Sequence, residues 1–330
     1  MSGALSWARL AYRQQSWEVF LLVAAAAGVG GGMLWVSSQI ESLRALRDAC
    51  LADTPQLCDV IVGRAYEPIQ TAQFLLQLSE LAPFAVGIVL GAPLVAREID
   101  GRTAPLAWAL SGSRTRWLIG RVLFVVAIAA LCLGILAWTS EIVAALLDPE
   151  RDLGRDFNFA DTRGPILVAR GFGALALAVL VGAVVGRLLP GLLAAILVIA
   201  AVFIGFGFLD GAILKAEARV VRIDPQTGTG VLGDHWLESG LQLTDGTALT
   251  WDEVARRGIE AEYADDGGDG CWYESQADFT AGRPVGCEVA WVVAGDRYFD
   301  VTVRRGVMLG GLGMLALAGT ATVVERRRPE

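Results

Sequence analysis

Few side chains in this chain of 330 residues could carry acid–base, nucleophilic or metal chemistry. His235 is the only histidine, which excludes the paired histidines of an HExxH zinc site. Lys215 is the only lysine, and no Gly-Lys pair is present, so the chain has no Walker A loop to hold the phosphates of ATP. A net charge of −8 gives no basic surface for nucleic acid. These residues predict that the chain is not an enzyme, binds no metal or cofactor of its own, and contacts no nucleic acid.

Charged and aromatic residues gather instead in the stretch 91–121, which reads GAPLVAREIDGRTAPLAWALSGSRTRWLIGR. Asp100 and Gly101 predict a turn. After that turn Thr103 can cap a helix, and Pro105 suits the first turn of that helix. The stretch therefore predicts a turn that leads into a new helix.

A short amphipathic helix is expected over residues 104–111. Leu106, Ala109 and Leu110 share one face of it, and Gly112 would end it. Ser113 could cap the helix that follows, and Trp117 could anchor that helix at a membrane interface. The simpler alternative is that residues 104–111 form a surface loop that binds no partner.

Glu98 lies at the edge of the preceding apolar run. A carboxylate at that depth is costly without a partner. Arg97, Arg102 or Arg121 could supply the opposite charge.

A second pair of charges, Glu80 and Arg170, lies within apolar runs. Each lies about 8–9 Å along its helix from the outer end of its apolar run, at 1.5 Å per residue. Opposite charges at matched depth can offset one another, so the two could form an ion pair. In the alternative, Arg170 extends outward to headgroups while Glu80 caps a turn.

The elements that position these residues are apolar runs near the 20 residues that a membrane-spanning helix needs. The chain is 54% hydrophobic and only 19% charged, which favours a polytopic membrane protein. Six spans are expected, of which the second is interrupted by Glu80, Pro83 and Pro93. The six cover residues 19–37, 75–96, 117–140, 165–186, 188–209 and 306–324.

The distribution of arginine predicts the orientation of these spans. If both termini are cytoplasmic, the inner segments hold 11 basic and 5 acidic residues, whereas the outer segments hold 15 basic and 30 acidic residues. Basic residues thus dominate the short inner segments, which predicts that both termini are cytoplasmic. Arg304 and Arg305, at the outer end of the last span, are the discordant residues.

The outer segment 210–303 is too long for a simple connection and is expected to fold as a small extracytoplasmic domain that contains β-strands. Residues 241–244 and 247–251 flank Asp245-Gly246, a pattern typical of a hairpin with a type I′ turn. Residues 289–293 and 298–303 predict further strands, and residues 264–270 predict a solvated loop.

Four of the five cysteines lie in the predicted outer segments, where disulfides persist. Four cysteines allow three pairings, of which short sequence separation favours Cys50–Cys58 with Cys271–Cys287. The alternative is four unrelated free thiols. Cys132 lies within the third span.

The fold class expected is therefore an all-α polytopic membrane protein with six transmembrane helices and a small β-containing domain between the fifth and sixth. Residues 1–18 mix aromatic, apolar and basic side chains, as in an amphipathic helix in the inner headgroup region or a plain tail. The remaining boundaries are spans one to five over 19–209, with a cytoplasmic loop at 97–117, the outer domain at 210–303, and the last span with its tail at 304–330.

The stretch 91–118 resembles the permeases of type 2 ATP-binding cassette (ABC) exporters, in particular a branch from GC-rich bacteria. That branch reads like PL-x-A-R-E-x-x-x-G-T, then L-A-W, then S-x-[ST]-R-x-R-W-L. The matching residues are Pro93-Leu94, Ala96-Arg97-Glu98, Thr103, Leu106-Ala107-Trp108, Ser111, Ser113-Arg114 and Arg116-Trp117-Leu118. One departure is Arg102, where the pattern has glycine directly before the threonine.

The resemblance implies a translocation path in membrane lipid that is formed by two permease chains, the second being another copy of this chain or a related permease. It also implies that the membrane is a bacterial cytoplasmic membrane and that ATP and Mg²⁺ are bound by a separate ATPase subunit. It further implies that residues 104–111 dock on that ATPase as a coupling helix. The residues expected to couple the two proteins are Glu98, Thr103, Leu106, Trp108, Leu110, Arg114 and Arg116. A non-transporting scaffold or sensor that displays the outer domain is the alternative function, and an adjacent gene for an ATPase would favour the exporter.

Overall fold

The computed structural model describes residues 15–53, 55–104, 108, 113–149, 151–223, 234–259, 262–263, 271–274, 278, 280–282 and 284–327. For residues 47–53, 55–65 and 262–263 it describes the backbone alone. The described residues form two compact units. The helical unit comprises those within 1–149, 159–204 and 302–330, and the sheet unit those within 150–158 and 205–301.

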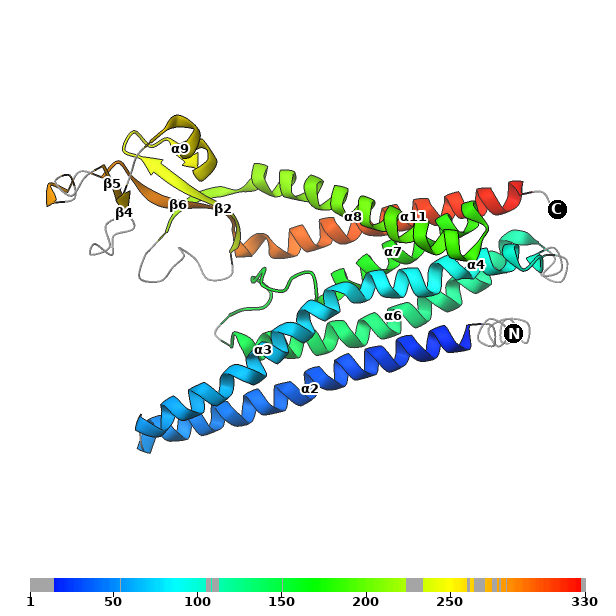
Figure 1. Cartoon of the computed structure of the whole chain (residues 1–330), viewed down its shortest axis with the longest axis horizontal. Coiled ribbons are helices and arrows are strands. Elements are labelled where there is room, and N and C mark those ends of the chain that lie inside the picture. Colours follow the sequence, from blue (N-terminus) through cyan, green and yellow to red (C-terminus); the bar gives the residue numbers. More distant parts are fainter. Residues whose placement is uncertain are drawn as a thin grey trace. The chain divides into compact units, whose positions relative to one another are not determined.

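Six helical segments of the described chain are long and apolar enough to cross a membrane, so the prediction of six spans is confirmed. Five of them contain the predicted run and extend beyond it, whereas the fourth covers 164–185 and ends one residue before the predicted 186. The helices that build them (Figure 1) are α2 (Ser16–Asp53), α3 (Pro55–Val86), α4 (Ala92–Asp100), α6 (Arg114–Leu147), α7 (Gly164–Val185), α8 (Leu188–Glu217) and α11 (Tyr298–Arg326).

The second span is helical throughout, despite its prolines. Pro83 lies inside α3 and Pro93 in the first turn of α4. Between them, η1 (Gly87–Gly91) adopts the wider π-helical turn. A π-turn is rare and often marks a functional position in a helix.

The polar residues that follow the first span continue its helix to Asp53, and α3 begins at Pro55. The first and second helices therefore extend well beyond the predicted spans 19–37 and 75–96. Sequences such as ESLRALR are rich in good helix formers, so the helix does not end where the apolar run ends. Cys50 and Cys58 lie on these helices, but their side chains and any disulfide between them are outside the described residues.

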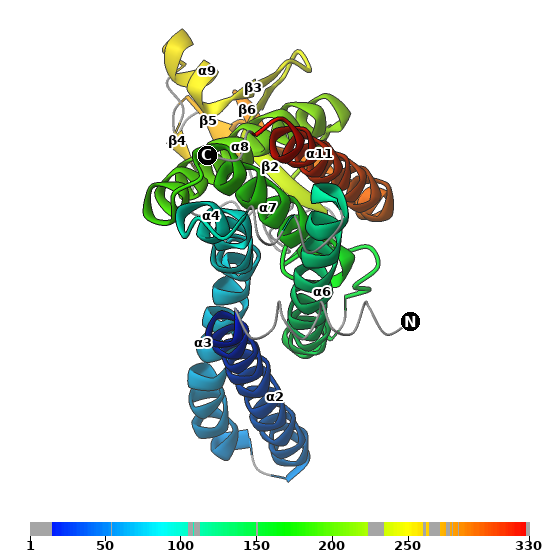
Figure 2. The ribbon, with the colours of Figure 1, turned by 90° about the vertical axis from the view of Figure 1, so that its right-hand side faces the viewer.

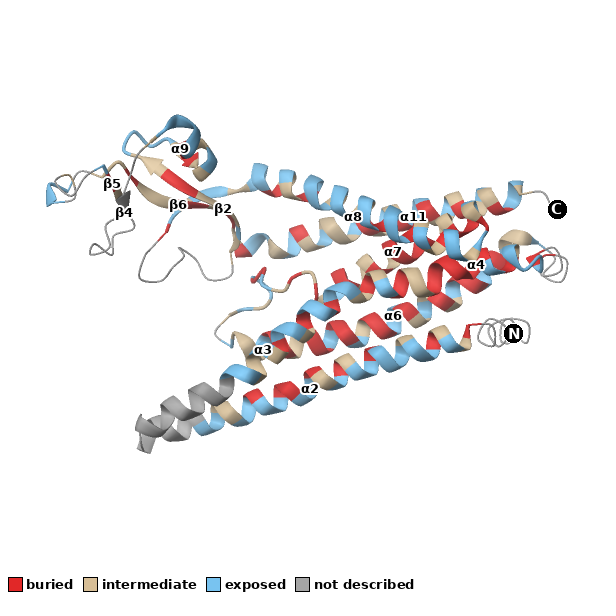
Figure 3. Cartoon of the chain, viewed as in Figure 1, coloured by how far each residue is buried: buried red, intermediate tan, exposed pale blue. Residues whose placement is uncertain are grey.

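The core of the helical unit is centred on α7, most of whose residues are buried (Figure 3). The close approach of α7 to the second span depends on small residues. A Cβ added at Gly87 would lie 2.8 Å from the Ala174 backbone carbonyl carbon, and one at Gly91 2.7 Å from the Leu175 carbonyl oxygen. Gly182 meets the carbonyl of Ala92 in the same way. Glycine is required here because any side chain would separate the two backbones.

The other face of α7 packs against α8 and α11, with alanine again at the contacts. The apolar cluster includes Ala174 and Ala178 of α7, Ala195 and Ile199 of α8, and Ala316 of α11. Figure 2 shows α7 among the other helices of the unit. α7 therefore contacts elements from both halves of the sequence.

The sheet unit contains an antiparallel sheet in the order β3-β2-β6-β5-β4, with β1 also paired to β6. Its elements are β1 (Arg219–Arg222), β2 (His235–Leu243), β3 (Ala248–Thr250), α9 (Trp251–Arg257), β4 (Glu262–Tyr263), β5 (Cys271–Tyr273), β6 (Gly286–Val293) and the 3₁₀ turn η2 (Gly295–Arg297). Side chains from β2, β3 and α9 form a small core around Leu241, Leu249 and Val254.

The predicted hairpin forms between β2 and β3, but its turn is not type I′. A type I′ turn needs positive φ at two residues, and only Gly246 has it, with φ +87°. The amide of Gly246 donates to Leu243 O and the amide of Leu243 to Thr247 O, each at 2.9 Å. The result is a three-residue loop. The backbone amide of Thr247 also donates to Asp245, which lowers the pKa of that carboxyl.

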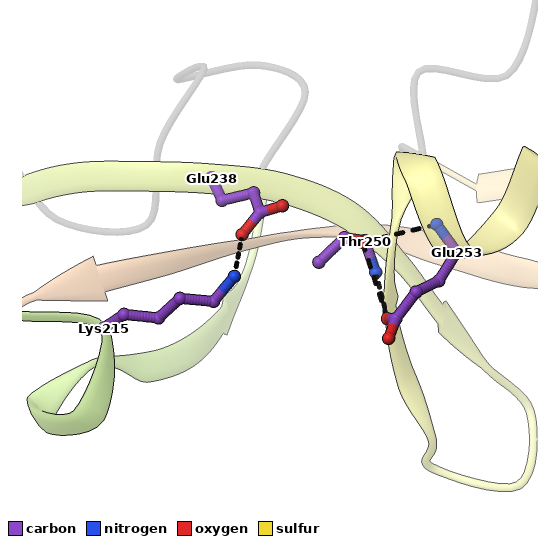
Figure 4. A network of polar contacts seen from close by, with 4 residues as sticks. All are labelled: Lys215, Glu238, Thr250 and Glu253. Carbon is purple, nitrogen blue, oxygen red and sulfur yellow. Dashed lines mark hydrogen bonds and ion pairs between the residues drawn. The ribbon is translucent and has the colours of Figure 1, made fainter. Parts of the chain in front are cut away.

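Figure 4 shows two polar contacts of this unit. Thr250 and Glu253 form a capping box that begins α9. Lys215 pairs with Glu238 of β2 at 2.6 Å on the surface. The capping box fixes where the hairpin turns into α9, whereas an exposed ion pair contributes little to stability.

The predicted strand at 298–303 is wrong, because α11 begins at Tyr298. Asp300 lies in the first helical turn, where an acid suits the helix dipole. Alternating side chains alone could not distinguish this helix start from a strand. The predicted strand at 289–293 is confirmed within β6.

Candidate functional site

One end of the helical unit collects the polar residues of the 91–121 stretch. At this end α4, α7 and α11 finish, while α2, α6 and α8 begin, and we refer to it as the loop end. Residues 105–107 and 109–112 lie outside the described part, so the predicted coupling helix, including Leu106 and Leu110, remains a prediction. The residues on both sides of it are described.

The turn that leaves the second span is a helix C-cap of the Schellman type. The amide of Thr103 donates to Glu98 O at 3.0 Å, and the amide of Arg102 to Ile99 O at 3.1 Å. Arg102 has φ +55° and occupies the left-handed position that glycine usually fills. The predicted turn is therefore present, but its left-handed residue is Arg102 and not Gly101. This is the position where the exporter pattern has glycine.

Glu98 lies at the centre of the loop end and is only 4% exposed. Its carboxylate pairs with Arg121 at 2.8 Å and also accepts a hydrogen bond from the hydroxyl of Thr103. Of the three arginines considered as partners, Arg121 of α6 is the one that forms this buried pair. Arg97 instead pairs with Glu18 of α2 at 2.9 Å.

Two tryptophans from either side of the loop lie edge to face, with ring centroids 6.4 Å apart. Trp108 and Trp117 are both buried. The guanidinium of Arg114 lies 4.5 Å from the centroid of Trp108, and that of Arg121 lies 4.9 Å from Trp117. The expectation that Trp117 anchors at the membrane surface is therefore wrong. Its ring packs against the ring of Trp108 and under the guanidinium of Arg121.

Arg114 connects the start of α6 to the end of α11. Its Nη1 donates to the carbonyls of Glu325 at 3.0 Å and Arg327 at 2.6 Å, with Val324 at 3.3 Å. A cation at a helix C-terminus satisfies carbonyls that have no partner within the helix. Thr115 donates to the side chain of Glu325 at 2.7 Å. Ser113 accepts from the amide of Arg116 and so caps α6 as predicted.

The remaining helices are joined to the same network. Asp100 accepts from the amide of Leu188 at 3.2 Å, which links the second span to the start of α8. Arg327 donates to Ala183 O near the end of α7. Every span thus has at least one polar contact at the loop end. Residue types did not reveal these links, although Asp100 was visible as a turn residue.

Of the residues predicted to couple the chain to a partner, the structure brings Glu98, Thr103, Trp108 and Arg114 together at the loop end. Arg116 is exposed in the first turn of α6. The hydroxyl of Thr103 bonds to Glu98, and any cap it gives to the next helix lies outside the described residues. The contacts organise the loop internally and leave Arg116 on the surface.

The possible ion pair between Glu80 and Arg170 is not formed in the structure. Arg170 donates to Asp161 O at 3.1 Å and lies 5.5 Å from the ring centroid of Phe84. Glu80 is exposed, and no ion pair joins it to Arg170 in the described part of the chain. The guanidinium of Arg170 interacts with a backbone carbonyl and with the face of an aromatic ring, and these contacts take the place of a carboxylate partner.

The disulfide Cys271–Cys287 is present in the sheet unit and joins β5 to β6. The two residues face each other in the antiparallel register. Cys132 is buried within α6. Across the described residues, no three side chains of histidine, cysteine, aspartate or glutamate are grouped closely enough to hold a metal.

Comparison with known proteins bears on the helical part of the chain. Residues 19–209 match the family model described as ABC-2 membrane transporter related. No curated protein and no solved structure matches the chain. The match contains the predicted spans one to five, and therefore most of the residues of the loop end.

Proposed function

The chain belongs to the ABC-2 membrane transporter related family, and on that premise we propose that it is the membrane-spanning permease subunit of an ATP-driven exporter. The six apolar helices and the family together make it a multi-pass membrane protein. Permeases of this family usually work with an ATPase subunit. ATP and Mg²⁺ would be bound by that subunit and not by this chain.

The observation that carries the proposal is the network at the loop end. Glu98, Arg114 and Asp100 tie the segment 97–117 to the ends of the surrounding helices. A partner that pressed on this segment would therefore move several spans together, because the contacts are direct and partly buried. An unanchored surface loop would absorb the same displacement locally.

Both termini are proposed to be cytoplasmic, which places the loop end at the cytoplasmic surface. The arginine excess of the short segments on this side supports that orientation. The disulfide of the sheet unit supports it too, because disulfides persist in extracytoplasmic compartments. Residues 210–303 would then contribute the extracytoplasmic domain.

A second permease copy would complete the translocation path within membrane lipid. This partner, the export direction and the branch from GC-rich bacteria rest on the resemblance of the 91–118 stretch. The scaffold or sensor remains a second candidate because the sheet unit is a folded module of its own. A scaffold or sensor function would leave the contacts at the loop end without a role.

The proposal is tested by co-purification of a separate ATPase with the tagged chain. The double variant Leu106→Asp and Leu110→Asp should abolish co-purification while membrane insertion persists, because two carboxylates would be buried in an apolar contact. Thr244→Asp, in the exposed turn of the sheet unit, adds the same kind of charge and should leave co-purification unchanged. Undiminished recovery of the ATPase with the double variant would show that residues 104–111 are not the main contact.

A further inference from the structure

The helical unit contains a cavity of about 450 Å³. None of the residues described at the loop end lines it. Its walls come from three helices. Val126 and Ala129 belong to α6, Val168 and Phe172 to α7, and Gly310 to α11. Every residue that lines it is apolar.

Small residues create the hollow. Alanines line the α6 and α7 sides, and a Cβ added at Gly310 would find no atom within 4 Å. Larger side chains at these positions would fill the space. The lining offers no partner for the two to four hydrogen bonds that a buried water needs, so an apolar guest is favoured over water.

The surroundings of Gly310 show where such a guest would come from. Val307 and Met314 lie three residues before it and four after it, so they share its helical face. They are 69% and 63% exposed. On a membrane-spanning helix such side chains face hydrocarbon. The cavity therefore opens beside a surface that the bilayer covers.

We propose that this cavity binds one acyl or alkyl chain of a lipid drawn from the bilayer. A cavity of about 150 Å³ accepts a benzene ring, so roughly three times that volume suits a long linear chain better than a small ring. The apolar lining recognises the chain alone, and the headgroup would remain outside. The site is separate from the loop end and does not depend on ATPase coupling.

The test uses the full chain in vesicles of phosphatidylethanolamine and phosphatidylglycerol that contain a trace of phosphatidylcholine with a diazirine on one acyl chain. After illumination, peptides from 126–133 and 165–175 should be labelled more strongly than those from 189–204, where α8 presents an exposed apolar surface. Excess hexadecanoic acid should compete with the first set only. Equal labelling of both sets, without competition, would overturn the proposal.

Gly310→Leu should reduce the cavity labelling to the level of α8, because leucine occupies the hollow. Gly311→Leu is the matched control, since Gly311 is the next residue, is exposed, and also has open space around it. Both changes favour the helix, so neither should prevent folding. Equal loss in both variants would contradict the assignment. An intermolecular disulfide formed through Gly310→Cys would also contradict it, because a second copy would then cover the cavity.

Discussion

The carboxylate of Glu98 is enclosed by groups that the chain supplies from the next turn and from the following span. Arg121 pairs with it, Thr103 donates to it, and all three side chains lie where α4 and α6 meet. A buried ion pair of this kind is weak evidence for net stability, but losing one partner leaves a charge in a poor environment. The pair therefore fixes the position of the loop relative to both helices.

Glu98→Gln should lower the thermal unfolding midpoint of the purified chain substantially. Removing one member of a buried pair costs about 3–5 kcal/mol, whereas an exposed pair is worth about 0–1 kcal/mol. Glu18→Gln is the matched control, because its partner Arg97 is 47% exposed. Similar midpoints for the two variants would show that the burial of the Glu98–Arg121 pair has no energetic consequence.

Arg102 adopts a conformation that suits glycine better. A non-glycine residue in the left-handed region costs about 1–2 kcal/mol. The hydrogen bonds of Thr103 and Arg102 to the end of α4 hold it there.

Arg102→Gly should raise the unfolding midpoint slightly, by the equivalent of about 0.5–1 kcal/mol, since relief of strain exceeds the added freedom of the unfolded chain. Arg102→Ala removes the same side chain but retains the Cβ, so it should not stabilise. Stabilisation by alanine equal to that by glycine would show that the arginine side chain, and not its backbone conformation, is unfavourable.

At the scale of elements, α7 is the helix around which the unit is packed. Gly87 and Gly91, four residues apart in the π-turn, let the second span touch the α7 backbone. Small residues allow close helix packing in membranes, where no hydrophobic effect drives helices together. The π-turn makes this contact itself, and α4 connects it to the loop end, so it is positioned to transmit displacements of the loop to α7.

Gly91→Ala should destabilise the chain by about 1–3 kcal/mol, because its methyl group would overlap the Leu175 carbonyl and Ala178. Gly134→Ala in α6 is the matched control, as nothing lies within 4 Å of its Cβ position. The control should be neutral or slightly stabilising, since alanine favours helices. The readout is the thermal midpoint in detergent, and equal midpoints would refute the close contact.

Apolar length was enough to predict all six spans, because crossing hydrocarbon imposes one physical requirement on every such helix. Helix ends were less predictable. Polar helix formers extend α2 to Asp53, and the alternating residues after Tyr298 start a helix. Near a membrane surface the local sequence pattern is compatible with a helix and with a non-helical segment, and tertiary contacts decide which of the two forms.

The residues of the loop end could be named from their motif, but not their partners. Glu98 offered three arginines as candidates, and only packing selects Arg121. The contacts of Arg114 with the end of α11 join residues more than 200 positions apart, which no local pattern reports. The pair Glu80–Arg170 failed for the same reason, since depth along a helix does not determine the direction in which a side chain points.

At the scale of the whole molecule, the family match and the loop end point to one role. The match covers residues 19–209, and the contacts of that region with the end of α11 extend the arrangement to the last span. All strands of the sheet unit lie outside the match, and several of them fold around a small core of their own. The proposed exporter permease would account for the helical unit, and in that proposal the sheet unit would contribute an extracytoplasmic function specific to this chain.

The central claim is that a separate ATPase binds at the loop end, and a photoreactive amino acid at Arg116 tests it most directly. Arg116 is exposed in the first turn of α6, next to the proposed contact. In living cells it should cross-link to a protein that carries a Walker A motif and binds ATP. The same amino acid at Thr244, in the sheet unit, should not. Capture of that ATPase from Thr244, or its absence at Arg116 in a correctly inserted chain, would contradict the account.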